Sequence, residues 1–366
     1  MGRRQRLRSG VCPVRIEPRA QTPAWLWLAA PLAALAFTLA VTSLLVAWAG
    51  APVGRSYALL LQGGFGSRFA WAETLTRATP LILTGLAVAV AFRARLYNIG
   101  AEGQLYAGAL AAVAVGGLHG GVGWPLPGWL LFPLMVVVAS AAGALLLLGP
   151  AWLKMRLGVD EVVTTLLLNF IVLLLVSAML DGPMKDPSAL GWPQSVAIAE
   201  PLQLDKLIPR SRVHTGLLAA LALALALAAL LRHTTLGLEI RAVGANARAA
   251  AFAGMPVRAV AYKVALLSGA LAGLAGAVEV AGRAGYVTLD MSPGYGYSGI
   301  VVAMLAALHP IGVVFAAVFV AGMLVGADSM SRAVGVPTYI ADVIVAVALI
   351  AVLVATLGVR WRVRFR

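Results

Sequence analysis

The stretch Leu96–Tyr106, LYNIGAEGQLY, sets one carboxylate and two amides between two strongly hydrophobic segments. Polar side chains in such surroundings are costly unless they form hydrogen bonds. The carboxylate, Glu102, follows Gly100 and precedes Gly103, and glycine lets the backbone leave helical geometry. The stretch therefore predicts a turn or a discontinuous helix between two apolar spans.

The composition of the whole chain explains these surroundings. Of 366 residues, 61% are hydrophobic and 11% are charged, whereas soluble globular chains are roughly 45–50% apolar and about 25% charged. These departures are typical of a polytopic membrane protein surrounded by lipid. The 28 basic residues, against 14 acidic ones, flank apolar segments instead of forming one stripe, which argues against nucleic-acid binding.

About ten apolar segments have, or nearly have, the length of a membrane-spanning helix, which is about 20 residues. They are 24–49, 75–94, 101–118, 129–149, 161–180, 213–231, 259–280, 296–308, 311–327 and 338–358. Lys and Arg favour the cytoplasmic side of a membrane. An even number of spans with both termini inside places most of the basic segments between spans on that side. We therefore expect an all-α chain of about ten transmembrane helices.

This arrangement divides the chain into a basic cytoplasmic tail at 1–23, a transmembrane domain at 24–358 and a second basic cytoplasmic tail at 359–366. Within the domain, the proline-rich segment 181–212 is expected outside the membrane, as an extended excursion with short helical pieces. The segment 232–258 is expected inside.

The inner segment contains a short predicted helix. Ala245–Gly254 is rich in alanine, a strong helix former. Asn246 suits an N-cap, and Gly254 followed by Pro256 suits a helix end. Two arginines, Arg241 and Arg248, accompany it.

A polar stripe is expected on the helix that begins after Asp160, which suits its N-cap. Glu161, Thr165 and Asn169 are four residues apart and share one face of this apolar helix. The stripe predicts either hydrogen bonds between helices or the wall of a polar pathway. For Asn98, Gly100, Glu102 and Gln104 the alternatives are support of the helix break, contact with a solute, and coupling to a cytoplasmic partner.

Three further features belong to the last third of the chain. Gly269, Gly273 and Gly276 suit close helix packing. The GYGYSG segment contains two tyrosines, Tyr295 and Tyr297. They are expected either at the outer membrane boundary, where aromatic residues are enriched, or stacked on a ring-shaped solute. Glu279 is expected to be solvated at an outer helix end.

The chain lacks sequence signs of catalysis. There is no phosphate-cradling G-x-x-x-x-G-K-[ST] motif, no G-x-S-x-G nucleophile motif and no histidine spacing for a metal. We therefore expect a conduit without a cofactor, not an enzyme.

Four stretches in order resemble the permease subunits of bacterial ABC importers for simple sugars and nucleosides, a branch that shares its fold with branched-chain amino acid permeases. They are LYNIGAEGQ, GVDEVVTTLLLNFI, TTLGLEIRAVGANARAAAFAGM and GYGYSGIVVAMLAALHPIG. The resemblance covers about 70–358, and it is weak in the first span and loose in 181–212. It implies the type II importer permease fold in the bacterial inner membrane.

The resemblance also implies partners: cytoplasmic ATP-binding subunits, a second permease subunit of a different chain, and an extracytoplasmic solute-binding protein. It implies that a coupling helix docks into the ATPase, with the matching residues Arg241, Gly244, Asn246, Arg248, Ala250 and Gly254. The pattern favours nucleosides as the solute, with simple sugars as the alternative.

An ion-coupled secondary transporter is the main rival class. Such a protein would be expected to carry coupling carboxylates at mid-membrane and internal repeats. The predicted spans place no acid at mid-depth, and no repeat is evident. A channel would need a filter-like ring motif, which is not visible.

Overall fold

The computed structural model describes residues 14–18, 24–117 and 127–335, together with scattered parts of 336–366. The predicted tails, apart from one strand in each, lie outside the described residues, as does much of the predicted last span at 338–358. The tail strands β1 (Val14–Pro18) and β2 (Trp361–Phe365) pair antiparallel.

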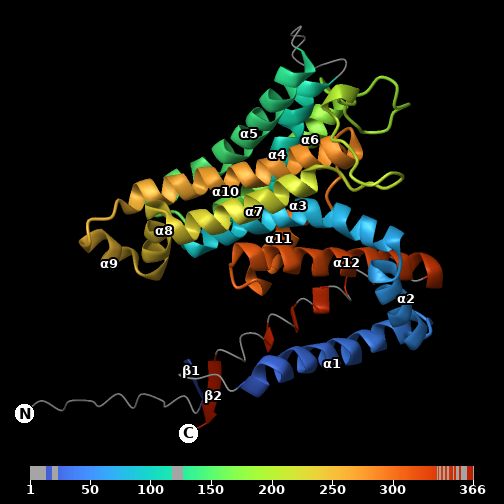
Figure 1. The fold of residues 1–366 in the computed structure, drawn as a ribbon, viewed down its shortest axis with the longest axis horizontal. Coiled ribbons are helices and arrows are strands. Elements are labelled where there is room, and N and C mark those ends of the chain that lie inside the picture. Colours follow the sequence, from blue (N-terminus) through green and yellow to red (C-terminus); the bar gives the residue numbers. More distant parts are fainter. Residues whose placement is uncertain are drawn as a thin grey trace, which may run out of the picture.

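Helices make up nearly all of the remaining regular structure (Figure 1). They are α1 (Ala24–Trp48), α2 (Val53–Phe65), α3 (Arg68–Arg93), α4 (Ala101–Gly116), α5 (Gly128–Leu157), α6 (Glu161–Asp181), η1 (Glu200–Leu202), α7 (Gly216–His233), α8 (Thr235–Ala245), α9 (Ala247–Phe252), α10 (Val257–Glu279), η2 (Val280–Ala284), α11 (Tyr295–Leu305) and α12 (Pro310–Val334).

The expectation of an all-α membrane chain is confirmed for the described residues apart from β1 and β2, but a count of ten spans is not. In the part of the chain that the structure describes, six helices are long and apolar enough to cross a membrane: α3, α5, α6, α7, α10 with η2, and α12. The pair α1 and α2, bent by 113°, makes a seventh if it counts as one span. Because α4 and α11 have only 16 and 11 residues, they are partial crossings.

The segment between the first two predicted spans, 50–74, is not a simple connection, because it contains α2 and the start of α3. Pro52 precedes α2, and Arg55, Gln62 and two adjacent glycines reduce its hydropathy below that of a span. The segment 181–212 is irregular with one short helical piece, η1, as expected.

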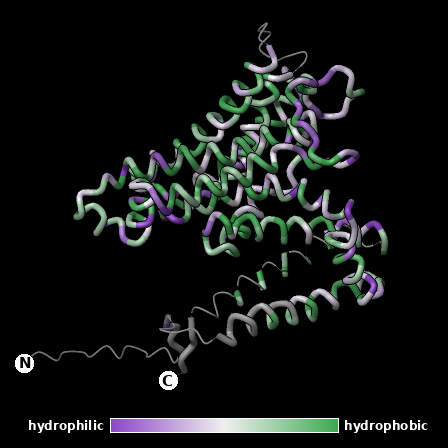
Figure 2. The backbone as a smooth tube through the Cα atoms, in the orientation of Figure 1, coloured by the Kyte–Doolittle hydropathy of each residue, from purple (hydrophilic) through white to green (hydrophobic). Residues whose placement is uncertain are grey.

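The two ends of the bundle differ in content. The short helices α8 and α9 lie at one end, and the irregular loop between α6 and α7 lies at the other (Figure 1). We call these the α8–α9 end and the loop end. The helices between them are largely apolar, and hydrophilic residues gather at both ends (Figure 2). This distribution suits a chain that crosses a lipid layer along the helix axes.

Small residues bring the central helices together. A Cβ added at Gly269 of α10 would lie 2.3 Å from the carbonyl oxygen of Gly143 in α5, so the two backbones are in direct contact. A Cβ at Gly276 would lie 1.9 Å from the carbonyl oxygen of Leu105 in α4. The predicted close packing of the glycine-rich helix is confirmed.

Candidate functional site

The predicted break follows α3 directly. The chain leaves helical geometry after Arg93 and resumes it at Ala101, and Asn98 organises the interval. Its side chain exchanges two hydrogen bonds of 2.9 Å with Gln104 and accepts one of 2.9 Å from the amide of Gly100. It also donates to Ser268 at the middle of α10 at 3.1 Å. The turn therefore lies within the bundle and not at its edge.

The polar stripe of α6 lies against this break. Its three side chains each accept a hydrogen bond from a main-chain amide of the break or of the first turn of α4: Glu161 from Tyr97 (3.1 Å), Thr165 from Ile99 (3.3 Å) and Asn169 from Gly103 (2.8 Å). Buried amides away from water need such partners. The stripe thus supplies bonds that the interrupted helix lacks, which is the interhelical alternative; a role in the pathway stays a prediction.

The end of α5 is tied to the same place. Lys154 forms an ion pair with Glu161 and donates a hydrogen bond of 2.9 Å to the carbonyl oxygen of Arg95. Arg95 has a left-handed backbone, with φ of 57°, at the point where the chain turns. The ion pair therefore fixes the position of α6 relative to the turn.

A second break in the helices lies between the end of η2 and the start of α11, at 285–294. Glu102 forms a hydrogen bond where this break ends, and not in the break before α4. Its carboxylate accepts a hydrogen bond of 2.6 Å from the amide of Gly296, in the first turn of α11. A Cβ at Gly296 would lie 2.1 Å from the main-chain nitrogen of Glu102, so the starts of α4 and α11 touch. A carboxylate at two helix N-termini offsets the positive ends of both dipoles. The prediction that Glu102 satisfies the break before α4 was therefore wrong.

Glu279 was also misjudged, because it is fully buried and not solvated. Its carboxylate pairs with Arg283 at 2.6 Å, and Arg283 donates to the hydroxyl of Tyr295 at 3.2 Å. The spacing of four residues between Glu279 and Arg283 was the available signal for the pair. Glu102 and Glu279 are both buried within the bundle; that no acid lies at mid-depth of the membrane stays a prediction.

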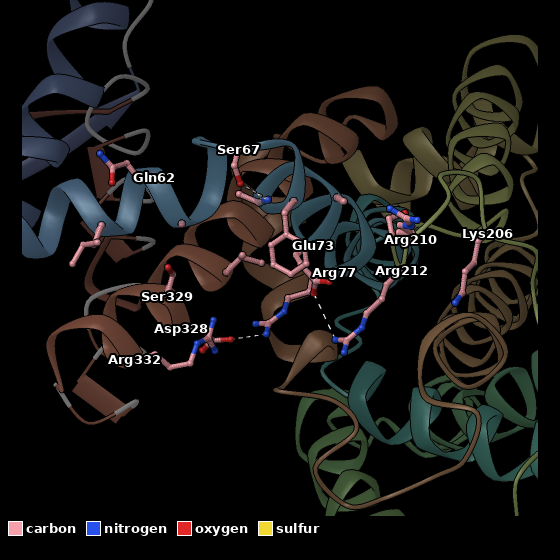
Figure 3. Close-up of a pocket in the computed structure, with 17 residues that line it drawn as sticks. Gln62, Ser67, Glu73, Arg77, Lys206, Arg210, Arg212, Asp328, Ser329 and Arg332 are labelled. Atoms are coloured by element: carbon pink, nitrogen blue, oxygen red, sulfur yellow. Dashed lines mark hydrogen bonds and ion pairs between the residues drawn. The ribbon is translucent and has the colours of Figure 1, made fainter.

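A cavity of about 650 Å³ opens at the loop end, between α2, α3, α12 and the segment 206–212 (Figure 3). Two ion pairs cross it, Arg77 with Asp328 at 2.5 Å and Arg212 with Glu73 at 3.8 Å. Three further basic side chains also line it: Lys206, Arg210 and Arg332. The cavity therefore carries an excess of positive charge and suits carboxylate groups.

At the opposite end, α9 has defined limits. The side chain of Asn246 accepts hydrogen bonds from the amides of Arg248 (3.0 Å) and Ala249 (3.1 Å), which confirms the predicted N-cap. Gly254, with φ of 78°, follows the last turn, and this confirms the predicted helix end. Phe252 is 95% exposed at the tip, a feature that the sequence analysis missed. A large exposed aromatic residue on a short, capped helix is typical of an interaction site.

The remaining residues of the predicted coupling segment lie in α8 and α9. Arg241 is exposed on α8, which the sequence analysis did not predict as a separate helix, and Ala250 is the buried side of α9. A Cβ at Gly244 of α8 would lie 1.8 Å from the carbonyl oxygen of Arg93. The guanidinium of Arg93 donates to the carbonyl oxygen of Leu308 at 3.0 Å. Thus α8, the end of α3 and the turn before α12 meet at one junction.

Comparison with known protein families identifies the family to which this chain belongs. A family model described as "Branched-chain amino acid transport system / permease component" matches residues 70–353. The chain belongs to this permease family. The match includes both breaks, the α6 stripe and the whole of α8 and α9.

The permease is similar along most of its length to several ABC transporter permeases. It is 37% identical over 361 residues to the glucose ABC transporter permease protein TsgB13 of Haloferax volcanii, covering 96% of this chain and 93% of that one. It is 37% identical over 326 residues to the guanosine permease protein NupP of Bacillus subtilis, covering 88% and 92%. It is 31% identical over 325 residues to the nucleoside permease protein NupB of Lactococcus lactis, covering 86% and 88%.

Membership of the family explains the missing phosphate-binding motif. Permease components of ABC transporters are distinct from the ATPase, and this permease is a multi-pass membrane protein whose long helices suit lipid. The functional roles of the residues in the breaks, the α6 stripe and the α8–α9 segment stay predictions.

Proposed function

We propose that the permease forms one half of a translocation pathway for nucleosides in the cytoplasmic membrane. A second permease subunit, a different chain, forms the other half. Separate cytoplasmic ATP-binding subunits drive the pair, and an extracytoplasmic solute-binding protein delivers the solute. The observation that carries this proposal is the capped α9 with its exposed Phe252, joined through α8 to the end of α3.

The distribution of charge supports the orientation. At the α8–α9 end the basic residues outnumber the acidic ones, whereas the loop end carries more of the acids, including Asp186, Glu200 and Asp205. The basic residues of the α8–α9 end are Arg93, Arg95, Lys154, Arg156, Arg232, Arg241, Arg248 and Arg258. Lys and Arg favour the cytoplasmic side of short loops. The α8–α9 end therefore faces the cytoplasm with both termini, and the loop end faces outward.

The junction at Arg93 supports a mechanism. Closure of the ATP-binding subunits displaces α9, and α8 transmits this displacement to the carbonyl of Arg93 and, through its guanidinium, to the turn before α12. The first break follows directly on Arg93, at the end of α3. ATP-driven movement switches access because it stabilises the two arrangements of the helices unequally.

Tyr297 supports a nucleoside pathway beside the breaks. The residue is 38% exposed, and its hydroxyl lies 3.2 Å from the amide nitrogen of Asn169, which donates to it. An exposed aromatic ring next to hydrogen-bonding groups suits a flat base attached to a sugar. Its companion Tyr295 is buried and bonded to Arg283, so the two tyrosines differ in role.

The cavity at the loop end supports the delivery step. Its excess of basic groups faces outward in this orientation, where it suits acidic residues on a docking protein. The relatives named for guanosine and nucleosides support the choice of solute. Simple sugars are the second candidate, because one equally similar relative is named for glucose.

Uptake into sealed vesicles tests the proposal. The complete transporter is reconstituted with ATP inside and the binding protein outside, and labelled guanosine is supplied with unlabelled uridine or glucose as competitor. We expect uptake that requires ATP and the binding protein and that uridine, but not glucose, reduces. Competition by glucose alone favours the sugar alternative, and uptake driven by an ion gradient without ATP overturns the proposal.

A further inference from the structure

A second cavity, of about 520 Å³, opens at the α8–α9 end between the end of α7 and the start of α12. Basic side chains from four parts of the chain line it: Arg93 of α3, Arg232 and His233 of α7, Arg241 of α8, and His309 before α12. Three of these groups are guanidiniums, which stay charged at any physiological pH. They converge on one cavity although they are distant in sequence.

No carboxylate lines this cavity among the described residues. The nearest acid in sequence, Glu239 on α8, is not part of the lining and takes part in none of the ion pairs that the described residues form. Within the described ranges, the guanidinium of Arg93 donates only to the carbonyl oxygen of Leu308. Like charges gathered without a counter-charge repel one another, so an anion in the cavity stabilises the arrangement.

The start of α12 adds to this preference. Pro310 and Ile311, its first two residues, line the cavity, and the helix continues for 25 residues. The positive end of its dipole therefore lies at the basic cluster. The loop-end cavity differs because its lining includes two carboxylates, Glu73 and Asp328, which pair with Arg212 and Arg77.

The remaining lining is apolar and continues along a membrane-spanning helix. Ala228, Ala229 and Leu231 of α7 and Ile311 of α12 complete the cavity, and Leu225, one turn deeper on α7, is exposed. An anionic head with an adjoining hydrocarbon chain matches a basic cluster with an apolar continuation. No residue of α9 lines the cavity, so the surface that presents Phe252 is separate from it.

We propose that this cavity binds the phosphate headgroup of an anionic phospholipid. An acyl chain of the lipid lies along α7, from the cavity toward Leu225. The lipid bridges α3, α7, α8 and α12 at the junction through which α8 contacts Arg93. The α8–α9 end faces the cytoplasm in the orientation given under the proposed function, so the lipid belongs to the inner leaflet; this assignment rests on that orientation. Binding of the lipid does not depend on nucleoside transport.

Lipid retention by the purified full-length chain tests the proposal without transport. The chain in neutral detergent is titrated with phosphatidylglycerol, with zwitterionic phosphatidylcholine and with inorganic phosphate, and bound lipid is counted by native mass spectrometry. We expect retention of phosphatidylglycerol that millimolar phosphate does not displace. Equal retention of phosphatidylcholine overturns the proposal, and full displacement by phosphate assigns the cavity to a free anion instead.

The matched variants move two charges inside or outside the cavity. Arg232→Gln with Arg241→Gln is expected to weaken phosphatidylglycerol binding about thirtyfold. Arg248→Gln with Arg258→Gln removes the same charge from exposed positions at the same end and is expected to retain the lipid. Equal losses in both variants would mean general surface attraction and would overturn the site.

A measurement on the wild-type chain tests the site even if the double variant does not fold. Photoactivatable phosphatidylglycerol is cross-linked to the wild-type chain, and the labelled peptides are identified. Label within 225–241 and 305–315 supports the site. Label confined to α9 or to the loop end overturns it.

Discussion

Gly244 and Arg93 are in backbone contact, since a Cβ at Gly244 would lie 1.8 Å from the carbonyl oxygen of Arg93. No side chain fits there without a shift of α8. The same arginine is bonded to Leu308 before α12, and the chain after it forms the first break. A displacement of α8 therefore reaches two parts of the bundle at once.

Replacing Gly244 with alanine tests this contact. We expect Gly244→Ala to lower the free energy of unfolding by about 1–3 kcal/mol, because overpacking forces the backbone to move. Uptake and ATPase stimulation by the binding protein should fall with it. Gly149→Ala is the control, because a Cβ at Gly149 of α5 meets no atom within 4 Å. Thermal unfolding in detergent and vesicle uptake compare the two; identical behaviour would exclude a tight junction.

The α6 stripe is tested at Asn169, whose side chain bonds to the amide of Gly103 and to the carbonyl of Ile99. We expect Asn169→Ala to destabilise the permease by about 1–3 kcal/mol, since buried main-chain groups lose their partners. Thr164→Ala is the control, because the Thr164 hydroxyl bonds, among the described residues, only to carbonyl oxygens at the start of its own helix. Equal melting temperatures for the two variants would show that the stripe does not hold the break.

Glu102 allows a test of the second break. Glu102→Gln keeps an oxygen acceptor for the amide of Gly296 and is expected to stay within about 1 kcal/mol of the wild type, whereas Glu102→Ala should cost about 1–3 kcal/mol. The measurement is thermal unfolding of both variants in the same detergent. A glutamine variant as unstable as the alanine variant would refute the assigned hydrogen bond.

The features that the sequence predicted well are local. The cap by Asn246 involves residues two and three positions away, and the shared face of Glu161, Thr165 and Asn169 follows from helical periodicity. In these cases the spacing alone fixes which groups lie near one another.

The features that the sequence did not predict depend on distant contacts. Glu102 meets Gly296, which lies 194 positions away, and only the packing of α4 on α11 brings them together. Glu279 is buried because neighbouring helices cover it, although its place near a helix end suggested solvent. The short α2 escaped notice because a bent half-span has too few apolar residues for a length criterion.

His214, in the loop just before α7, predicts a pH dependence. Its ring is buried, neither nitrogen has a hydrogen-bond partner among the described residues, and burial lowers its pKa to about 4, against about 6.5 in an unfolded chain. Between these values the unfolded chain binds a proton that the native chain does not. The free energy of unfolding should therefore fall by up to about 3 kcal/mol as pH drops from about 6.5 to about 4.

The measurement is a series of melting temperatures across that pH range for the wild type and for His214→Leu. The variant should show a shallower decline, because it has no proton to bind at this position. If the melting temperatures of the wild type and the variant decline with equal slope, groups other than His214 cause the acid sensitivity. Above about pH 6.5 this residue should add no pH dependence, since it is neutral in both states.

The most direct measurement compares two exposed phenylalanines in the reconstituted transporter. Phe252→Ala removes the aromatic tip of α9, whereas Phe315→Ala removes an exposed ring from the side of α12. We expect Phe252→Ala to fold normally yet to lose about tenfold or more in ATP-subunit binding and guanosine uptake, as for a buried interface residue worth about 2 kcal/mol, while Phe315→Ala retains both. Full binding and uptake by Phe252→Ala would contradict the role of α9 as the receiver of ATP-driven motion.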